Sequence, residues 1–403
     1  MTQLLPPTAA PDAARLIGTR AARGFADGLA SVLLASYLSR LGFTPVQIGA
    51  IATATLFGSA ALLLAVGLLG HRYPRRTVLL ASAALMSVTG VAFYLATGFW
   101  PLLVVAFLGT LNPSSGDVTL FLPTEQAVLA ESAAPRDRTS LFAWYNLAGA
   151  FAGALGSLAA GLPDALAPAR AAQAERAAFL VYAALGAFSA FAYRKLSPHL
   201  EPPRSARAAP LEKSRGVVLQ LAALFSLDAF GGGFVVQSIV ALWLFLRFQL
   251  PVPTAGAIFF AVNLLAAISQ LVSARIAARI GHVRTMVYTH LPANVFLVLA
   301  GMMPTLPLAV LFLLLRAMLS QMDVPARQAY VMAMVPRDER AAAASVTNVP
   351  RSLASAVGPL LAGVLLQVSL FGWPLICAGA LKIVYDLTLF ARFSRRAPAE
   401  GGD

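Results

Sequence analysis

Charged residues are scarce in this sequence, and cysteine and histidine are scarcer still. Only 12% of the 403 residues are charged, whereas 59% are hydrophobic. Soluble domains have about 25% charged residues, so this composition excludes a water-soluble globule. The single cysteine, Cys377, excludes a disulfide within the chain. No Ser-His-Asp set, metal triad or phosphate loop can be assembled at one depth, so we expect neither an enzyme nor a bound cofactor or metal.

Apolar runs long enough to cross a bilayer are abundant. A spanning helix needs about 20 apolar residues. We therefore expect an all-α membrane protein with twelve transmembrane helices, at residues 19–41, 46–70, 77–96, 101–132, 139–161, 177–194, 216–248, 254–279, 285–303, 306–334, 340–368 and 373–393. The polar, basic stretch 195–215 is expected to be a cytoplasmic linker between an N-terminal bundle of six helices (1–194) and a C-terminal bundle of six helices (216–403).

The basic residues are distributed unevenly among the loops. The net charge is +13, and most of the 30 Lys and Arg residues fall in the amino-terminal segment, the even-to-odd loops or the tail. On the opposite side lie only Arg40, Arg170, Arg176 and Arg247. This positive-inside pattern predicts an inner (plasma) membrane protein with both termini in the cytoplasm. The basic charge thus indicates orientation in the bilayer, and we expect no nucleic-acid partner.

The two halves of the sequence are related by a parallel repeat. At an offset of 202 residues the first half matches the second at Pro, Gln, Asn and Gly positions, which are Pro123, Gln126, Asn146 and Gly156 against Pro325, Gln328, Asn348 and Gly358. Matches of these residue types at one spacing indicate a duplicated unit rather than shared composition.

The loop between the second and third spans reads GLLGHRYPRRTVLL, from Gly67 to Leu80. It is similar to the G-x-L-a-D-r-x-G-r-k signature of the major facilitator superfamily, although His71 stands where that family usually has Asp and Pro74 where it has Gly. With the twelve spans, the basic central loop and the repeat, the chain resembles this family over residues 16–396. The resemblance implies two pseudo-symmetric bundles that alternate access to a central cavity.

The resemblance also implies a role for the basic residues of this loop. Arg72, Arg75 and Arg76 are expected to stabilise one state by contacting helix C-terminal ends and nearby carboxylates, and so to take part in gating. Attraction of the loop to anionic lipid is the alternative.

Ionisable residues at membrane depth are candidates for function because a charge in lipid is costly. By resemblance, an acid in the first helix binds protons, which indicates Asp27, with Asp228 at the equivalent depth of span seven. Asp117, halfway along span four, is a further proton-coupling candidate. An ion pair between Asp27 and the nearby Arg23 is the alternative for Asp27.

Two pairs of charges at membrane depth suggest ion pairs. Glu125 and Arg327 occupy equivalent repeat positions, and we predict that they bridge the two halves as a gate; the alternative for Arg327 is a local pair with Asp323, one turn away. Lys382 and Asp386 are four residues apart on one helix, so we predict a structural pair between them.

A central cavity is expected to be lined by polar side chains from several spans, namely Asp117, Arg316, Asp323, Asn263 and Gln237. Asp117 follows the NPSSG run, whose Gly and Pro residues loosen a helix at a depth where only a cavity or packed protein can satisfy the backbone. Hydrogen bonding between helices is the alternative role for Asn263 and Gln237.

Residues 149–161, GAFAGALGSLAAG, partly resemble the glycine-rich signature of exporters in the family, with Ala154 at the expected Pro. We therefore expect a monomeric, proton-coupled secondary transporter that exports a small organic molecule. Proton-coupled uptake is the alternative direction. A sensor or scaffold that moves no solute is disfavoured by the charges at membrane depth.

Ions are the alternative substrates. A hard cation would use the oxygen ligands of Asp27, Asp117 and Asp228, and an anion would use Arg316, Arg327 or Arg351. A transition metal is disfavoured because the histidines, His71, His199, His282 and His290, all map to cytoplasmic loops or to the ends of spans.

Overall fold

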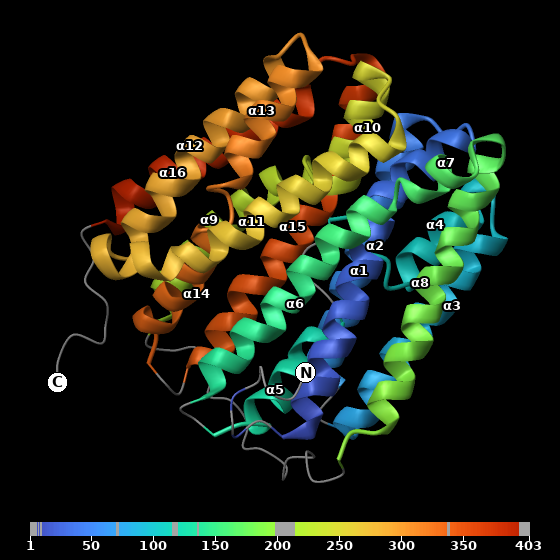
Figure 1. Ribbon diagram of the computed structural model, residues 1–403. Coiled ribbons are helices and arrows are strands. Elements are labelled where there is room, and N and C mark those ends of the chain that lie inside the picture. Colours follow the sequence, from blue (N-terminus) through green and yellow to red (C-terminus); the bar gives the residue numbers. More distant parts are fainter. Residues whose placement is uncertain are drawn as a thin grey trace. The chain divides into compact units, whose positions relative to one another are not determined.

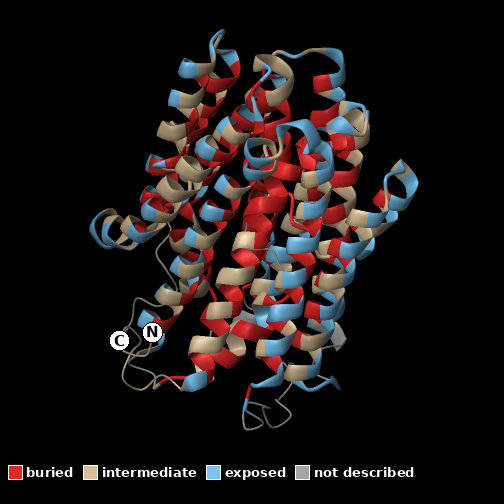
Figure 2. Cartoon of the chain, turned by 45° about the vertical axis from the view of Figure 1, so that its right-hand side comes forward, coloured by how far each residue is buried: buried red, intermediate tan, exposed pale blue. Residues whose placement is uncertain are grey.

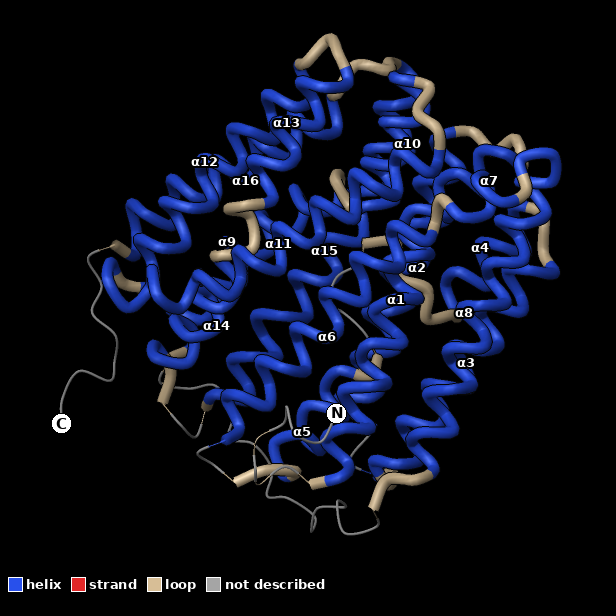
Figure 3. The backbone as a smooth tube through the Cα atoms, viewed as in Figure 1, coloured by secondary structure: helices blue, strands red, loops and turns tan. Residues whose placement is uncertain are grey.

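The computed structural model describes residues 6, 8, 10–69, 72–114, 120–134, 137–197, 214–336 and 339–394. Within these residues every regular element is a helix (Figure 3). The chain divides into two compact units. The N-terminal unit comprises Met1–Ser205 and Gln249–Phe260, and the C-terminal unit comprises Ala206–Phe248 and Ala261–Asp403. Most of the expected linker, 198–213, lies outside the described residues, so its role as a domain boundary stays a prediction.

The described helices lie on either side of the expected linker. Those before the linker are α1 (Pro11–Arg40), α2 (Pro45–Leu69), α3 (Arg75–Leu95), α4 (Phe99–Leu108), α5 (Leu122–Glu131), α6 (Arg138–Ala159), α7 (Leu162–Leu166), η3 (Pro168–Arg170) and α8 (Ala171–Arg194). Those after it are α9 (Arg215–Gly233), α10 (Gln237–Phe248), α11 (Val252–Ile280), α12 (His282–Met302), α13 (Leu306–Ala317), α14 (Asp323–Met334), α15 (Arg340–Val368) and α16 (Trp373–Phe393).

The described chain contains nine helical segments long and apolar enough to cross a membrane, and α4 and α13 are shorter apolar helices. Three spans expected to be continuous are each divided in two. Span four becomes α4 and α5, span seven becomes α9 and α10, and span ten becomes α13 and α14. Three consecutive glycines, 231–233, end α9, and glycine is a poor helix former. In span ten the carbonyl of Arg316 accepts from the N–H groups of Leu319 and Ser320, which tightens the chain into a turn.

Glycines bring α1 and α6 into backbone contact within the N-terminal unit (Figure 1). A Cβ atom added to Gly24 would lie 2.3 Å from the carbonyl oxygen of Gly149, and one added to Gly28 would lie 1.9 Å from that of Gly153. Only glycine permits so close an approach. The glycines that resemble an exporter signature therefore have a packing role in this structure.

The C-terminal unit repeats this contact between α9 and α15. A Cβ atom on Gly233 would lie 2.2 Å from the carbonyl oxygen of Ser355, and one on Gly358 would lie 2.3 Å from the carbonyl carbon of Gly233. In each unit, then, the first helix packs on the helix of the fifth span. Buried and exposed residues alternate along most of the helices (Figure 2), as expected when one face of a helix packs inward.

Candidate functional site

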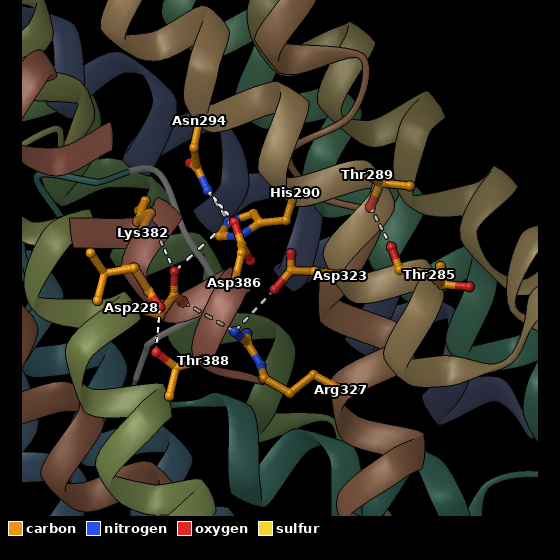
Figure 4. Close-up of polar contacts among 11 residues, drawn as sticks. Asp228, Thr285, Thr289, His290, Asn294, Asp323, Arg327, Lys382, Asp386 and Thr388 are labelled. Carbon is orange, nitrogen blue, oxygen red and sulfur yellow. Dashed lines mark hydrogen bonds and ion pairs between the residues drawn. The ribbon is translucent and has the colours of Figure 1, made fainter. Parts of the chain in front are cut away.

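Seven polar or charged side chains gather in the interior of the C-terminal unit, and all of them are buried (Figure 4). We call them the C-cluster. Its members are Asp228 of α9, His290 and Asn294 of α12, Asp323 and Arg327 of α14, and Lys382 and Asp386 of α16. Buried charges persist only when they are paired or hydrogen-bonded, so the partners of each group define what the C-cluster can do.

Asp228 is the carboxylate with the most cationic neighbours in the C-cluster. The Nζ of Lys382 donates to its Oδ1 at 2.6 Å, and the Nη1 of Arg327 donates to its Oδ2 at 3.3 Å. The Nε2 of His290 lies 3.7 Å from Oδ1. Three groups that can be positively charged therefore converge on one buried carboxylate, and a change in the charge of His290 alters the balance among them.

Asp386 is held from α12 rather than from its own helix. Its Oδ1 lies 2.8 Å from the Nδ1 of His290, and its Oδ2 accepts from the Nδ2 of Asn294 at 2.9 Å. The predicted pair of Lys382 with Asp386 is therefore wrong. The long lysine side chain reaches the buried Asp228 on α9, where its charge, together with that of Arg327, compensates a carboxylate removed from water.

His290 lies deeper in the fold than the sequence pattern predicts. It lies in α12 and is buried, so its assignment to a loop or the end of a span is wrong. One signal was available in THLPAN, since His290 and Asn294 are one helical turn apart and share a face. Within the described residues, no group of three or more His, Cys, Asp or Glu side chains has an arrangement suited to a metal ion.

Arg327 forms the local pair that was the alternative to a gate. Its Nη1 donates to the Oδ2 of Asp323 at 3.1 Å, four residues earlier on α14. Asp323 was expected to line a cavity. In this arrangement it is buried and bonded to Arg327.

The N-terminal unit contains a second buried network, centred on Glu125 of α5. Arg23 of α1 donates to both carboxylate oxygens, at 2.7 and 2.5 Å. Thr19 donates at 2.8 Å, and the hydroxyls of Tyr145 and Tyr193 each donate at 2.5 Å. Five donated hydrogen bonds satisfy a carboxylate with no exposed surface, whereas the Nε of Arg23 is buried without a hydrogen-bond partner among the described residues.

The two networks connect equivalent helices with opposite charges. In the N-terminal unit a cation on the first helix, Arg23, binds an anion on the fourth span, Glu125. In the C-terminal unit an anion on the first helix, Asp228, binds a cation on the fourth span, Arg327. Glu125 and Arg327 are thus each bonded within their own unit, and a bridge between the halves stays a prediction.

Asp27 lines a narrow pocket inside the N-terminal unit. The polar groups around this pocket come from Arg23, Ser59, Thr110 and Tyr182, and the apolar ones from Leu62, Met86, Leu120 and Phe121. The hydroxyl of Tyr182 donates to the carbonyl of Thr110 at 2.9 Å. Asp27 is buried, as a coupling carboxylate should be, whereas Asp117 lies outside the described residues.

The other expected cavity residues lie in different helices. Arg316 is in the last turn of α13 and is half-buried. Gln237 is buried at the start of α10, and Asn263 is half-buried in α11; each takes part in a polar interaction. Their role in a substrate cavity stays a prediction.

The signature loop after α2 makes contacts of the two kinds expected from the resemblance. Arg75 donates to the Oε2 of Glu131, at the end of α5, at 2.7 Å. Arg76 donates to the carbonyl of Arg194, the last residue of α8. Arg72 is exposed, and His71 lies outside the described residues. The loop thereby ties α3 to two other helices of its unit, while its part in gating stays a prediction.

A duplicated set of apolar helices with buried ionisable networks defines a polytopic membrane protein of the transporter class. The model of the Major Facilitator Superfamily matches residues 16–315 and 221–403. The chain belongs to this family of secondary transporters, which confirms the resemblance seen in the sequence and the fold class.

Similar proteins cover almost the whole chain. An uncharacterized membrane protein of Saccharomyces cerevisiae, YJR124C, is 26% identical over 91% of this chain and 90% of its own length. A variant of the nucleoside transporter NupG has a TM-score of 0.77 at 14% identity, covering 95% of this chain and 100% of that one. A bacterial homologue of the iron transporter ferroportin has a TM-score of 0.73 at 15% identity, covering 96% and 99%.

The xylose transporter XylE from E. coli has a TM-score of 0.72 at 12% identity, covering 96% of each chain. These structural similarities, at such low identity, establish the shared fold. The names of these solved structures refer to different solutes, so the similarity of fold does not identify the solute of this chain.

Proposed function

We propose that this protein is a proton-coupled secondary transporter that exports a small organic solute across the inner (plasma) membrane, as a monomer with both termini in the cytoplasm. The observation that supports proton coupling is the position of His290 between two buried carboxylates, Asp386 at 2.8 Å and Asp228 at 3.7 Å. Histidine is the side chain whose ordinary charge change falls between about pH 5 and 8.

The chemistry of coupling follows from the neighbours of His290. A protonated imidazole places one positive charge between the two carboxylates, whereas a neutral imidazole leaves Asp228 to Lys382 and Arg327 and Asp386 without a cationic partner among the described residues. Proton loading would therefore redistribute the ion pairs that join α9, α12, α14 and α16. The charged and titratable groups that face His290 or surround it are Asp228 of α9, Asp323 and Arg327 of α14, Arg351 of α15, and Lys382, Tyr385 and Asp386 of α16.

Asp27 is the second coupling candidate. It is buried beside polar groups in the N-terminal unit, whereas the nearby Arg23 is bonded to Glu125. In this proposal Asp27 and the C-cluster are two proton-binding positions, one in each half of the duplicated chain.

The direction of transport rests on the resemblance of residues 149–161 to exporters. Because Gly149 and Gly153 also have a packing role, uptake in symport with protons is the alternative. In antiport the solute moves opposite to the flow of protons, and in symport it moves in the same direction as that flow. Under one imposed pH difference the two modes therefore move the solute in opposite directions, and one assay separates them.

The test is transport in proteoliposomes. Vesicles containing purified protein would be loaded with a defined mixture of sugars, nucleosides, amino acids and organic acids, and mass spectrometry would follow the internal contents after a pH gradient is imposed. We expect at least one compound to move against its own gradient and to stop moving when a protonophore is added. Equal redistribution with and without the pH gradient would contradict proton coupling.

A further inference from the structure

Two arginines of the C-terminal unit, Arg316 of α13 and Arg351 of α15, differ from the other arginines at membrane depth. Arg23 is ion-paired to Glu125, and Arg327 to Asp228 and Asp323. Across the part of the chain that the structure describes, neither Arg316 nor Arg351 forms an ion pair within 4.0 Å. The Nε atoms of both are buried and have no hydrogen-bond partner there, as is also true of the Nε of Arg23, so the missing ion pair is what distinguishes these two residues.

An unpaired guanidinium at membrane depth is costly, because nothing offsets the loss of its hydration. Both residues are only half-buried, so part of each side chain is accessible while its Nε is covered. This combination is typical of a side chain that binds a ligand from an aqueous cavity rather than of one that stabilises the fold.

The carboxylates that surround these arginines are already occupied. Both arginines lie within electrostatic reach of Asp228, and Arg351 also of Asp323. Asp228 is bonded to Lys382 and Arg327, and Asp323 to Arg327. The cations of this region, Arg316, Arg327, Arg351 and Lys382, outnumber its carboxylates, Asp228, Asp323 and Asp386, before any charge on His290 is counted.

The backbone next to Arg316 also indicates a binding region. The span is interrupted between α13 and α14, at residues 318–322. Irregular backbone at membrane depth is tolerated where it is buried in protein or lines a water-filled cavity. In duplicated transporters, spans broken at corresponding positions of the two halves mark the binding site, and span four is interrupted here as well.

We propose that Arg316 and Arg351 are residues that bind an anionic oxygen group, a carboxylate or a phosphate, of the transported solute. Guanidinium groups suit these anions because their N–H donors match two oxygens at once. The inference deepens the proposed function and rests on it for the statement that the bound molecule is transported. Anion binding itself rests on the absence of ion pairs to the two arginines among the described residues, on their buried Nε atoms and on the interrupted span beside Arg316.

The first test is thermal unfolding of purified full-length protein at constant ionic strength. Replacing chloride by millimolar inorganic phosphate or acetate is expected to raise the Tm of the wild-type protein by about 2 °C or more. Arg316→Gln and Arg351→Gln are each expected to weaken the apparent affinity roughly tenfold or more. Arg279→Gln, an exposed arginine in the last turn of α11, is the matched control and keeps the response. No rise in the wild-type protein, or an equal rise in all variants, would overturn the proposal.

A second readout separates a binding role from a structural one. In buffer poor in these anions, Arg316→Gln and Arg351→Gln are expected to unfold at the same temperature as the wild-type protein or higher, because each removes a desolvated charge without a partner. Arg327→Gln, which breaks ion pairs, is expected to unfold at a lower temperature. If the first two variants were destabilised as strongly as the third, the two arginines would be structural and the proposal would fail.

Two further arms identify the source of the anion. Glucose 6-phosphate and benzoate are expected to stabilise the protein, whereas their neutral counterparts glucose and benzamide are not. If phosphatidylglycerol in mixed micelles stabilised the protein but no soluble anion did, the arginines would bind a lipid headgroup. That result would overturn the proposal that they bind a transported solute. Anion binding without pH-driven transport would contradict the proposed coupling alone, and transport without an anion effect would contradict this inference alone.

Discussion

Arg23 and Glu125 form an ion pair between α1 and α5 in which both side chains are buried and two hydrogen bonds, of 2.7 and 2.5 Å, join the guanidinium to the carboxylate. The residues are 102 positions apart in the sequence. The pair connects α1, the first helix of the N-terminal unit, to α5, the second helix of its fourth span. Asp228 and Arg327 make the equivalent connection in the C-terminal unit. The duplication has therefore preserved an ion pair between the first and fourth spans of each unit and reversed its charges.

Glu125→Gln is expected to lower the stability of the protein. The change leaves Arg23 buried without its counter-charge, which in other buried pairs costs about 3–5 kcal/mol. Thermal unfolding of purified protein measures it. The control is Glu131→Gln on the same helix, whose pair with Arg75 is partly exposed and worth about 1 kcal/mol or less. Equal destabilisation by both changes would contradict the central role of the Glu125 network.

Asp228 and Lys382 are expected to be energetically coupled. Asp228→Asn leaves Lys382 and Arg327 with less compensation in a buried site, and Lys382→Met removes one of the two excess charges. The double variant should therefore be more stable than the sum of the single changes by about 1 kcal/mol or more. A double-mutant cycle of unfolding free energies measures the coupling. The pair of Arg40 with Asp164 is exposed, and its cycle should give a smaller value.

His290→Gln is expected to uncouple protons from solute. Glutamine retains an amide that can bond Asp386 but does not change charge with pH, so transport against a solute gradient should stop while exchange of solute across the membrane continues. Both are measured in the proteoliposomes with the compound that the mixture identifies. His282→Gln, at the start of the same helix, is the control and should keep both activities. Undiminished pH-driven transport by His290→Gln would show that coupling occurs elsewhere.

Asp27→Asn tests the other proton-binding position. A coupling carboxylate that can no longer ionise should lose uphill transport and retain counterflow exchange. Asp12→Asn, near the start of α1, is a control for changes of charge on that helix. Loss of both activities in Asp27→Asn would indicate a role in binding or folding instead.

Exchanging the charges of Glu125 and Arg327 tests the gate between the halves. Each residue is bonded within its own unit, so a bridge between them would form in another state of the transport cycle. If it forms there, the double variant Glu125→Arg with Arg327→Glu is expected to recover transport that each single variant loses. No recovery in the double variant would reject the gate.

Much of the architecture was accessible from the sequence because the bilayer restricts the choices. Apolar runs longer than a bilayer crossing must form helices, since every backbone group has to be satisfied inside the segment. The residues matched at an offset of 202 indicated the duplication, which the contacts of Gly233 and Gly358 reproduce in the second half. The break in span ten was missed because residues 318–322, MLSQM, contain neither Gly nor Pro.

The partners of several buried charges could not be predicted from the sequence. Lys382 lies one turn from Asp386, so spacing favoured a pair within one helix, and Arg23, one turn from Asp27, suggested such a pair as the alternative for Asp27. The structure instead bonds Lys382 to Asp228 and Arg23 to Glu125. His290 entered the cluster for a similar reason, because α12 packs against α16 and brings it to Asp386.

The sequence by itself thus determined a duplicated helical membrane protein of a known transporter family, with ionisable residues at membrane depth. Only the tertiary structure decided which of those residues are neutralised and which, like Arg316 and Arg351, have no ion pair among the described residues. The physical reason is the length of charged side chains in a medium of low dielectric. A lysine or arginine side chain is long enough to reach a carboxylate on its own helix or on a neighbouring helix. The packing of the helices therefore decides which carboxylate is buried beside it and pairs with it.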